Sequence, residues 1–300
     1  MKVGVVMPIG REERSGEIPG WAAIRAAAHA AEESGLDSIW VYDHLLFRSE
    51  GEPTEGIHEA WTMLAALAAE TRRVELGILV LAMPFRNPAL LAKMAATLEE
   101  VSGGRLILGV GCGWHEPEFD AFGFPFDHRV GRFEEALEVM VPLVREGRVD
   151  FAGRWHAARD AEVLPRYARP DGRPTPILIA GKRPRMLELV VRHADAWNAA
   201  WLGPASQLEE RLVPLRAALA AGGRDPASLE ITVGVNVVMP TPDAESQAIP
   251  ANALSGDVES LVTELQQYAD LGVGTVIISV EPGTPQAVLE LGRAAALFRG

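Results

Sequence analysis

Residues 76–119 restrict the fold of this chain more than any other stretch. They read LGILVLAMPFRNPALLAKMAATLEEVSGGRLILGVGCGWHEPEF. The continuous apolar runs at 76–81 and 106–110 are typical of strands buried on both faces. Between them, apolar residues recur at helical spacing from Pro88 until a Gly-Gly pair at 103–104 ends the helix. Two buried strands joined by a helix predict a parallel βαβ unit.

The same order of elements recurs along the whole chain. Strands are expected at residues 3–7, 38–42, 76–81, 106–110, 177–180, 195–199, 231–238 and 275–280, each followed by a helix. Eight such units in a single domain of residues 1–300 predict an α/β fold, the (β/α)8 TIM barrel. A doubly wound open sheet is the alternative, although the turn at 7–10 lacks the G-x-G-x-x-G of a dinucleotide-binding sheet.

Three long connections are expected to be insertions, because long loops in compact domains are often functional. They follow strands two, four and seven, at residues 43–59, 111–129 and 240–256. Residues 148–176 form a further excursion with a short hairpin around 149–156. Ligands of barrels bind at the carboxyl ends of the strands, so the loops after strands three and four should face one site.

Composition limits the partners of the protein. The formal charge of −13 argues against a nucleic-acid or anionic-membrane surface. The single cysteine, Cys112, excludes an internal disulfide and is typical of a reducing compartment. The apolar run after Met1 is too short for a signal peptide, and no apolar segment of about 18 residues follows. We therefore expect a soluble cytoplasmic protein.

Asp43-His44 directly follows the second expected strand, so both residues should stand at the mouth of the barrel. Imidazole chemistry suits proton transfer near neutrality, which makes His44 the candidate catalytic residue. Asp43 is expected to fix the tautomer of His44 or to cap the loop. A purely structural pair at the strand end is the alternative.

Gly111, Gly113 and Trp114 follow the fourth expected strand. The glycines would let a flat ring or a phosphate lie against the backbone, and Trp114 would wall a planar ligand. A tight turn anchored by a tryptophan is the alternative. His115-Glu116 lacks metal-ligand spacing, so no metal is expected.

Ala180, Gly181, Lys182 and Arg183 follow the fifth expected strand and lead into a helix. Backbone N–H groups at a helix N-terminus with flanking cations form an anion site. The basic cluster stands out in an acidic chain and predicts an anion site. A solvated run of charge is the alternative.

Five segments together resemble the bacterial-luciferase-like monooxygenase superfamily, in particular its branch that uses the deazaflavin coenzyme F420. They are IWVYDH at 39–44, GILVLAMPFRNP at 77–88, SGGRLILGVGCGWHEPEFDAFG at 102–123, PILIAGKRPRMLELVVRHADAWN at 176–198 and GVGTVIISV at 272–280. The resemblance spans nearly the whole chain, and the third and fourth segments are its most specific part.

The resemblance implies a TIM barrel, a cis peptide at Leu79–Val80 whose bulge presses on the cofactor ring, and a catalytic or ring-contacting role for His44. Family members are commonly dimers, so a homodimer is expected. The residues expected to hold the cofactor are Asp43, Leu79, Val80, Ala82, Gly111, Gly113, Trp114, Ala180, Gly181, Lys182 and Arg183.

Two departures concern the sugar-phosphate dehydrogenases of this branch. Trp114 stands where they have an acidic glutamate after the strand-four glycines, and Arg48 stands where they have a tryptophan. A sugar-phosphate substrate is therefore not expected. His115 or Glu116 would have to replace the missing acid.

Three functions remain open. The first is hydride transfer between F420 and a small hydrophobic substrate, with His44 taking or supplying the hydroxyl proton. Apolar residues in the loops at the mouth suggest the hydrophobic substrate. The second is a monooxygenase that uses reduced FMN and dioxygen. The third is a non-catalytic barrel that binds a flavin or deazaflavin.

Overall fold

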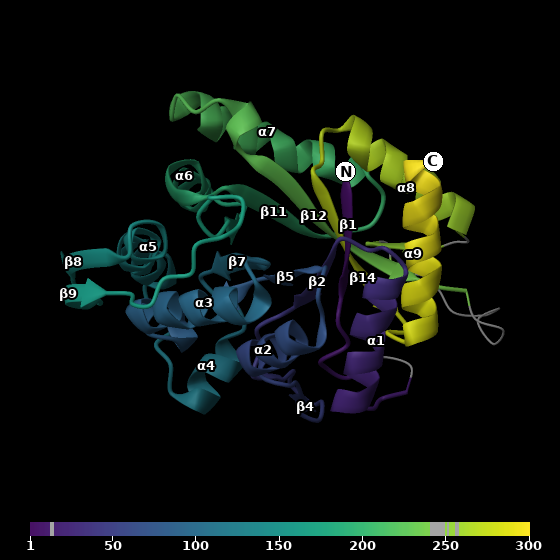
Figure 1. The fold of residues 1–300 in the computed structure, drawn as a ribbon, viewed down its shortest axis with the longest axis horizontal. Helices are drawn as coiled ribbons and strands as arrows, with labels where there is room; N and C mark the ends of the chain where they lie inside the picture. Colours follow the sequence, from purple (N-terminus) through teal and green to yellow (C-terminus); the bar gives the residue numbers. More distant parts are fainter. Residues whose placement is uncertain (13–14, 241–249, 251, 256–257) are drawn as a thin grey trace.

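Eight parallel strands close into a barrel, which confirms the predicted TIM-barrel fold (Figure 1). The computed structural model describes the chain except for residues 13–14, 241–249, 251 and 256–257. In order around the barrel the strands are β1 (Lys2–Val6), β2 (Ser38–Val41), β5 (Glu75–Ile78), β7 (Leu106–Gly111), β10 (Ile177–Ala180), β11 (Ala196–Leu202), β12 (Glu230–Val238) and β14 (Thr275–Glu281). β14 pairs with β1 and β7 pairs with β10, so the ring is complete.

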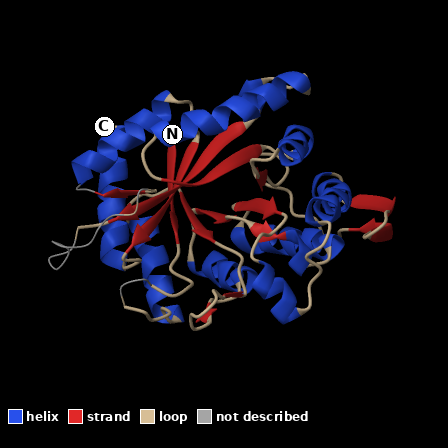
Figure 2. Cartoon of the chain, turned by 180° about the vertical axis from the view of Figure 1, so that it is seen from behind, coloured by secondary structure: helices blue, strands red, loops and turns tan. Residues whose placement is uncertain are grey.

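Helices surround the strands on the outside of the barrel, as Figure 2 shows from behind. They are α1 (Trp21–Glu33), α2 (Ala60–Glu70), α3 (Pro88–Ser102), α4 (Glu116–Phe122), α5 (Arg129–Arg145), α6 (Pro184–His193), α7 (Ser206–Ala221), α8 (Val258–Asp270) and α9 (Pro285–Arg299), with 3-10 turns η1 (Met83–Phe85) and η2 (Pro226–Ser228). The side chain of Asn87 caps α3, and Gly103 ends it in the left-handed conformation at φ +69°.

Trp40 fills the interior of the barrel and is 1% exposed. It packs in one cluster with Val6 and Leu79. A Cβ on Gly77, on the neighbouring strand β5, would lie 2.1 Å from the Trp40 ring, so only glycine leaves room for the indole. The indole N–H donates to Ser38 Oγ at 2.8 Å, which satisfies its polar group inside the barrel.

The expected strand at 76–81 is interrupted, which corrects the prediction of one continuous run. β5 ends at Ile78, and a separate short strand, β6 (Leu81–Ala82), pairs with the end of β7. Between them the Leu79–Val80 peptide bond is cis, as the family resemblance implied. A Cβ on Gly109 would lie 1.9 Å from the Ile78 carbonyl oxygen, so β7 needs glycine where it faces this bulge.

The long connections contain elements of their own. β3 (Leu46–Phe47) and β4 (Glu55–Gly56) form a small hairpin after β2, and α4 occupies part of the expected loop 111–129. The hairpin expected around 149–156 is β8 (Arg148–Ala152) with β9 (Ala157–Glu162), beside α5 in Figure 1. Most of the insertion expected at 240–256 lies outside the described residues; β13 (Ala253–Ser255) pairs with β12.

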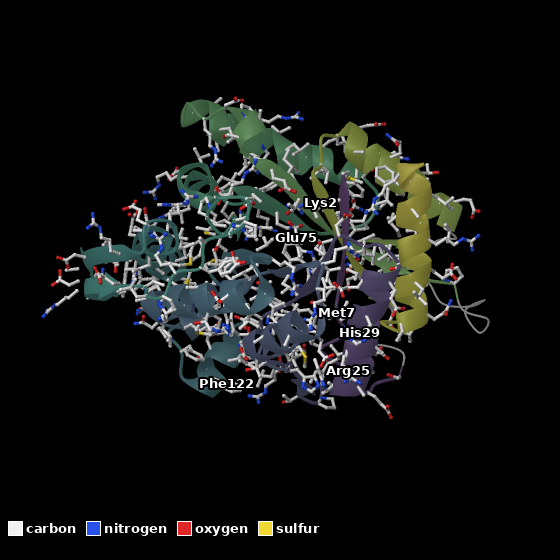
Figure 3. The ribbon with its side chains drawn as sticks, in the orientation of Figure 1. Lys2, Met7, Arg25, His29, Glu75 and Phe122 are labelled. Atoms are coloured by element: carbon white, nitrogen blue, oxygen red, sulfur yellow. The ribbon has the colours of Figure 1, made fainter. Side chains whose placement is uncertain are left out.

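The two ends of the barrel differ in the side chains they present. At the amino end of the strands, Lys2 Nζ lies 2.7 and 2.9 Å from the Glu75 carboxylate oxygens, and Figure 3 shows these two residues together, away from Met7. The carboxyl end carries the residues singled out from the sequence. Among the helices described, none is long and apolar enough to cross a membrane.

Candidate active site

The residues predicted to form a site follow four neighbouring strands. β2, β5 with β6, β7 and β10 lie next to one another in the barrel, and all four are parallel. Their carboxyl ends therefore bring the segments 43–44, 79–82, 111–114 and 180–183 to one edge of the barrel mouth. Parallel barrels bind their ligands at this end.

His44 is held by Glu118, a residue that the sequence reasoning did not single out. His44 Nδ1 lies 2.9 Å from Glu118 Oε1, and the backbone N–H of Leu45 donates to Oε2 at 2.8 Å. A carboxylate only accepts hydrogen bonds, so Nδ1 carries the proton and Nε2 is the free nitrogen of the neutral ring. Glu118 is 1% exposed, so the pair interacts with little screening by water.

The sequence around Glu118 explains its fixed position. α4 has Pro117 in its first turn and ends at Gly123, whose φ of +76° suits glycine. Phe119, the next residue, is fully buried and packs beside Ala82. A Cβ on Gly113 would lie 2.5 Å from the Phe119 ring, so Gly113 lets α4 dock against the loop after β7.

Aromatic rings surround the imidazole of His44. The centroids of Phe47 and Trp114 lie 4.4 and 5.4 Å from the His44 centroid. Trp114 is 63% exposed, so it stands at the mouth rather than in the core. An imidazole flanked by two aromatic rings and only 15% exposed can exchange a proton with a bound ligand in a partly dry environment.

His115 joins two loops, whereas the sequence suggested it as a replacement for the missing acid. Its Nε2 accepts a hydrogen bond from the backbone N–H of Arg48 at 3.1 Å and so joins the loops after β2 and β7. Burial lowers the pKa of His115, which favours the neutral ring that can accept this bond. Glu116 is exposed on α4. The acid that contacts His44 is therefore Glu118. It is neither His115 nor Glu116, the two residues suggested from the sequence.

Asp43 does not fix the tautomer of His44, contrary to one of the two expectations for it. Its carboxylate binds both terminal nitrogens of Arg86, at 2.6 and 2.9 Å, and accepts the backbone N–H of Ala82 at 2.9 Å. Burial raises the pKa of Asp43, and the paired Arg86 guanidinium opposes this effect. Asp43 thus ties the end of β2 to β6 and η1. Whether it also touches a cofactor stays a prediction.

The glycines after β7 make room for protein groups. A Cβ on Gly111 would lie 2.8 Å from a methyl group of Val80, so this glycine lets the bulge at Leu79–Val80 press against β7. Gly113 adopts φ +71° and makes room for Phe119. That these glycines contact a cofactor stays a prediction. The observation that supports it is the bulge at Leu79–Val80, for which Gly111 makes room.

The loop after β10 leaves a helix N-terminus open. Arg183 is the N-cap residue of α6, no side chain caps this end, and Pro184 occupies the first turn. Lys182 and Arg183 are exposed beside it, and the Gly181 carbonyl accepts the indole N–H of Trp197 at 2.8 Å. Positive charge next to uncapped N–H groups is the arrangement that binds phosphate.

Comparison with known proteins identifies the family. The family model described as luciferase-like monooxygenase matches residues 1–275. The chain therefore belongs to the luciferase-like monooxygenase family, which confirms the resemblance read from the sequence.

Two curated relatives are similar over about 70% of this chain. One is the phthiodiolone/phenolphthiodiolone dimycocerosates ketoreductase of Mycobacterium kansasii, 35% identical over 230 residues, which are 70% of this chain and 61% of the relative. The other is the F420-dependent glucose-6-phosphate dehydrogenase of Kineococcus radiotolerans, 35% identical over 212 residues, 69% of this chain and 61% of the relative. The chain thus spans less than two thirds of the length of these relatives.

A solved structure agrees with the fold over the full chain. It is an F420-dependent secondary alcohol dehydrogenase in complex with an F420-acetone adduct, with a TM-score of 0.79 and 19% identity. The match covers 100% of this chain and 99% of that one. At this identity the likeness concerns the barrel itself.

Proposed function

We propose that the protein is an F420-dependent oxidoreductase that transfers hydride between the coenzyme and a small hydrophobic alcohol or carbonyl compound. The observation that carries the proposal is the pairing of His44 with buried Glu118 at the carboxyl end of β2. A carbonyl that gains hydride also needs a proton, and an alcohol that loses hydride must release one. The two curated relatives are named as a ketoreductase and an F420-dependent dehydrogenase, which are enzymes of this class.

The residues present fit the coenzyme. Coenzyme F420 supplies a deazaflavin ring that carries hydride and a phosphate on the chain attached to the ring. The uncapped N-terminus of α6 with Lys182 and Arg183 suits the phosphate, and the bulge at Leu79–Val80 offers a surface for the ring. Ala180 and Gly181 lie between these two sites along the mouth.

The protein itself would handle the proton and the geometry. Glu118 keeps the proton of His44 on Nδ1, so Nε2 faces the substrate oxygen as acceptor, or as donor once the ring is protonated. The buried carboxylate stabilises the cationic ring that proton uptake produces. Phe47 and Trp114 exclude water from the reacting atoms and accept an apolar substrate.

A monooxygenase that uses reduced FMN is the second candidate, because the family takes its description from such enzymes. FMN also ends in a phosphate, which suits the same helix N-terminus. A barrel that binds the cofactor without turnover is the third candidate. It predicts tight binding and no reaction with any alcohol, ketone or dioxygen.

A binding comparison tests the proposal. The purified protein is titrated with oxidised F420 and, separately, with oxidised FMN, and cofactor fluorescence is followed. Micromolar binding of F420 together with weaker binding of FMN is the expected result. Binding of FMN alone, or oxygen uptake with reduced FMN, would favour the monooxygenase. Binding of F420 without hydride exchange across a panel of small alcohols and ketones would favour the non-catalytic barrel.

A further inference from the structure

Residues 45–58 cover one side of His44, and we call this segment the flap. It leaves the end of β2, folds into the hairpin of β3 and β4, and leads into α2. It carries Phe47, whose ring centroid lies 4.4 Å from that of His44. The tip of the hairpin, residues 48–54, is exposed. The position of the flap therefore decides how closely water can approach His44.

The returning half of the flap is fixed by backbone contacts. Ile57 forms an antiparallel bridge with Gly10, in the loop after β1. The backbone N–H of His58 donates to the carbonyl of Ile9 at 2.9 Å. Backbone hydrogen bonds of this kind do not depend on pH, so this half of the flap stays anchored to the barrel.

The outgoing half of the flap is tied to side chains at the start of α4. The backbone N–H of Leu45 donates to the Glu118 carboxylate, and that of Arg48 donates to Nε2 of His115 at 3.1 Å. Among the contacts named for the two halves, only the one between Arg48 and His115 ends on an imidazole. An imidazole changes its charge near neutral pH, so this contact alone can respond to a small change in acidity.

Packing fixes the orientation of the His115 ring. His115 is the N-cap residue of α4. Its ring centroid lies 5.5 Å from that of Phe47 on the flap and 5.2 Å from that of Trp114. A ring held between the backbone of α4 and these aromatic neighbours presents Nε2 to the flap in one orientation.

The hydrogen bond from Arg48 requires the neutral form of His115. In the neutral ring Nε2 accepts and Nδ1 carries the hydrogen, whereas in the cation both nitrogens donate. Protonation would therefore place two N–H donors opposite each other. Arg48 is exposed, so its N–H can turn to water instead, and the flap loses this anchor.

The surroundings of His115 set the pH at which this happens. The charged and titratable groups next to the ring are Glu116 and Glu118 on α4, His44 at the end of β2, and Arg48 on the flap. Burial lowers the pKa of His115, and the charge of Glu118 opposes this effect without cancelling it. The hydrogen bond is therefore complete above the ordinary value of about 6.5. It is lost as the pH falls through the lowered pKa of His115 under the closed flap.

We propose that His115 is a positioning residue that holds the flap closed over His44 in its neutral form and releases the flap when it is protonated. The consequence for catalysis rests on the proposed function, because a closed flap would exclude water from the atoms that exchange hydride and proton. The hydrogen bond itself belongs to the protein without cofactor. It can therefore be tested separately from the reaction.

Amide hydrogen exchange of the flap is the test. Deuterium uptake of residues 45–50 is followed from about pH 8 to about pH 5, and each rate is divided by the intrinsic rate at that pH. We expect the protection of these amides to fall about two- to tenfold over this range, the equivalent of one net hydrogen bond. Peptides from β1 and β14 should keep their protection. Constant protection of the flap across the range would overturn the inference.

Two substitutions of His115 separate the hydrogen bond from the packing. His115→Phe keeps an aromatic ring beside Phe47 and Trp114 but has no acceptor, so the flap should show the low protection of the wild type at pH about 5 at every pH. His115→Gln has an amide oxygen as many bonds from the backbone as Nε2 and does not titrate, so the flap should stay protected throughout. His29→Phe, which removes a surface histidine of α1 labelled in Figure 3, is the matched control and should behave as the wild type.

The variants also give the results that would contradict the inference. Full protection in His115→Phe at neutral pH would show that the hydrogen bond does not hold the flap. A pH dependence retained in His115→Gln would assign the titration to another group and overturn the role of His115.

Kinetics with F420 and a panel of small alcohols and ketones test the consequence for catalysis. His115→Phe should raise KM about two- to tenfold and lower kcat less than twofold, because the flap positions the substrate and takes no proton. A larger loss in kcat than in KM would contradict a positioning role. Absence of hydride exchange in the wild type would overturn the proposed function, and the amide exchange would still decide whether His115 holds the flap.

Discussion

His44 and His115 lie side by side at the barrel mouth and differ in how they use the imidazole ring. Their ring centroids are 6.4 Å apart. His44 turns Nδ1 to the buried carboxylate of Glu118, which stabilises the cationic ring. His115 accepts the backbone N–H of Arg48, which only the neutral ring can do. The first arrangement suits the exchange of a proton with a substrate, and the second suits the positioning of a loop.

The comparison predicts that turnover and flap closure respond to different substitutions. Changes at His44 and Glu118 should lower the rate and leave the protection of the flap intact. Changes at His115 should do the opposite. Each variant is therefore measured for turnover and for the amide exchange of residues 45–50.

His44→Ala should have the largest effect. Removal of the acid–base group should lower turnover by roughly 10²–10⁴-fold, because the substrate oxygen then has no partner for its proton. The amide exchange of the flap should stay within about twofold of the wild type. His29→Ala, a surface histidine on α1 paired with Glu70, is the control and should leave turnover unchanged. A loss of less than threefold in His44→Ala would remove His44 from the mechanism.

Glu118→Gln should have the next largest effect. The amide keeps the shape of the carboxylate but removes the charge that stabilises a protonated His44, so turnover should fall on the order of 10-fold or more. In the double variant with His44→Ala, the second change should add almost nothing, since Glu118 acts through His44. Additive losses would indicate a separate structural role. Glu116→Gln, on the exposed face of the same helix, is the matched control and should change turnover by less than twofold.

The barrel could be predicted from the sequence because its signals are local. Apolar runs, glycines at helix ends and their repetition along the chain gave all eight strands of the barrel to within a few residues. The break in the third strand could not be predicted from such local signals, because residues 76–81 form one continuous apolar run. Only the family resemblance pointed to Leu79–Val80, where the structure has a cis peptide.

The candidate site could be predicted only in part. Strand ends give the position of His44, but the partner of His44 lies 74 residues further on, in a segment read as loop. A short helix could have been predicted from the E-P-E-F sequence at 116–119 and the glycine four residues after Phe119. That prediction would have placed Glu118 on α4 next to Phe119. The sequence suggested that Asp43 would contact His44, but Asp43 pairs with Arg86. Successive side chains of an extended chain point to opposite sides, so adjacent residues at a strand end do not face each other.

Gly131→Ala should have a smaller effect, confined to a part of the fold that holds neither histidine. The added methyl group would lie 2.8 Å from Trp155 and must displace the indole from the first turn of α5. The free energy of unfolding, measured in urea, should fall by about 1–3 kcal/mol, while turnover and flap exchange stay unchanged. Gly20→Ala is the matched control, because a Cβ there meets nothing within 4 Å. A drop in turnover without a loss of stability would contradict the restriction of the chemistry to the barrel mouth.

Stronger acidification should produce the smallest effect, through Glu135, which holds a turn as His115 holds the flap. Burial raises the pKa of this carboxyl, but the backbone N–H groups of Arg154, Trp155 and His156 in the β8–β9 turn outweigh it, so the pKa is lowered overall. A lowered pKa in the folded state means that the anchoring of the turn is complete above the unfolded value of about 4.3. The anchoring of the turn is lost as the pH falls through the pKa that Glu135 has in the folded protein.

The environment of Trp155 reports this loss. We expect its fluorescence, taken as the difference between the wild type and Trp155→Phe, to change below pH about 4.3, while far-ultraviolet circular dichroism still indicates the folded barrel. In Glu135→Gln the neutral amide cannot titrate, so the same signal should be flat across that range. A transition of the same size in Glu135→Gln would show that another group fixes the turn.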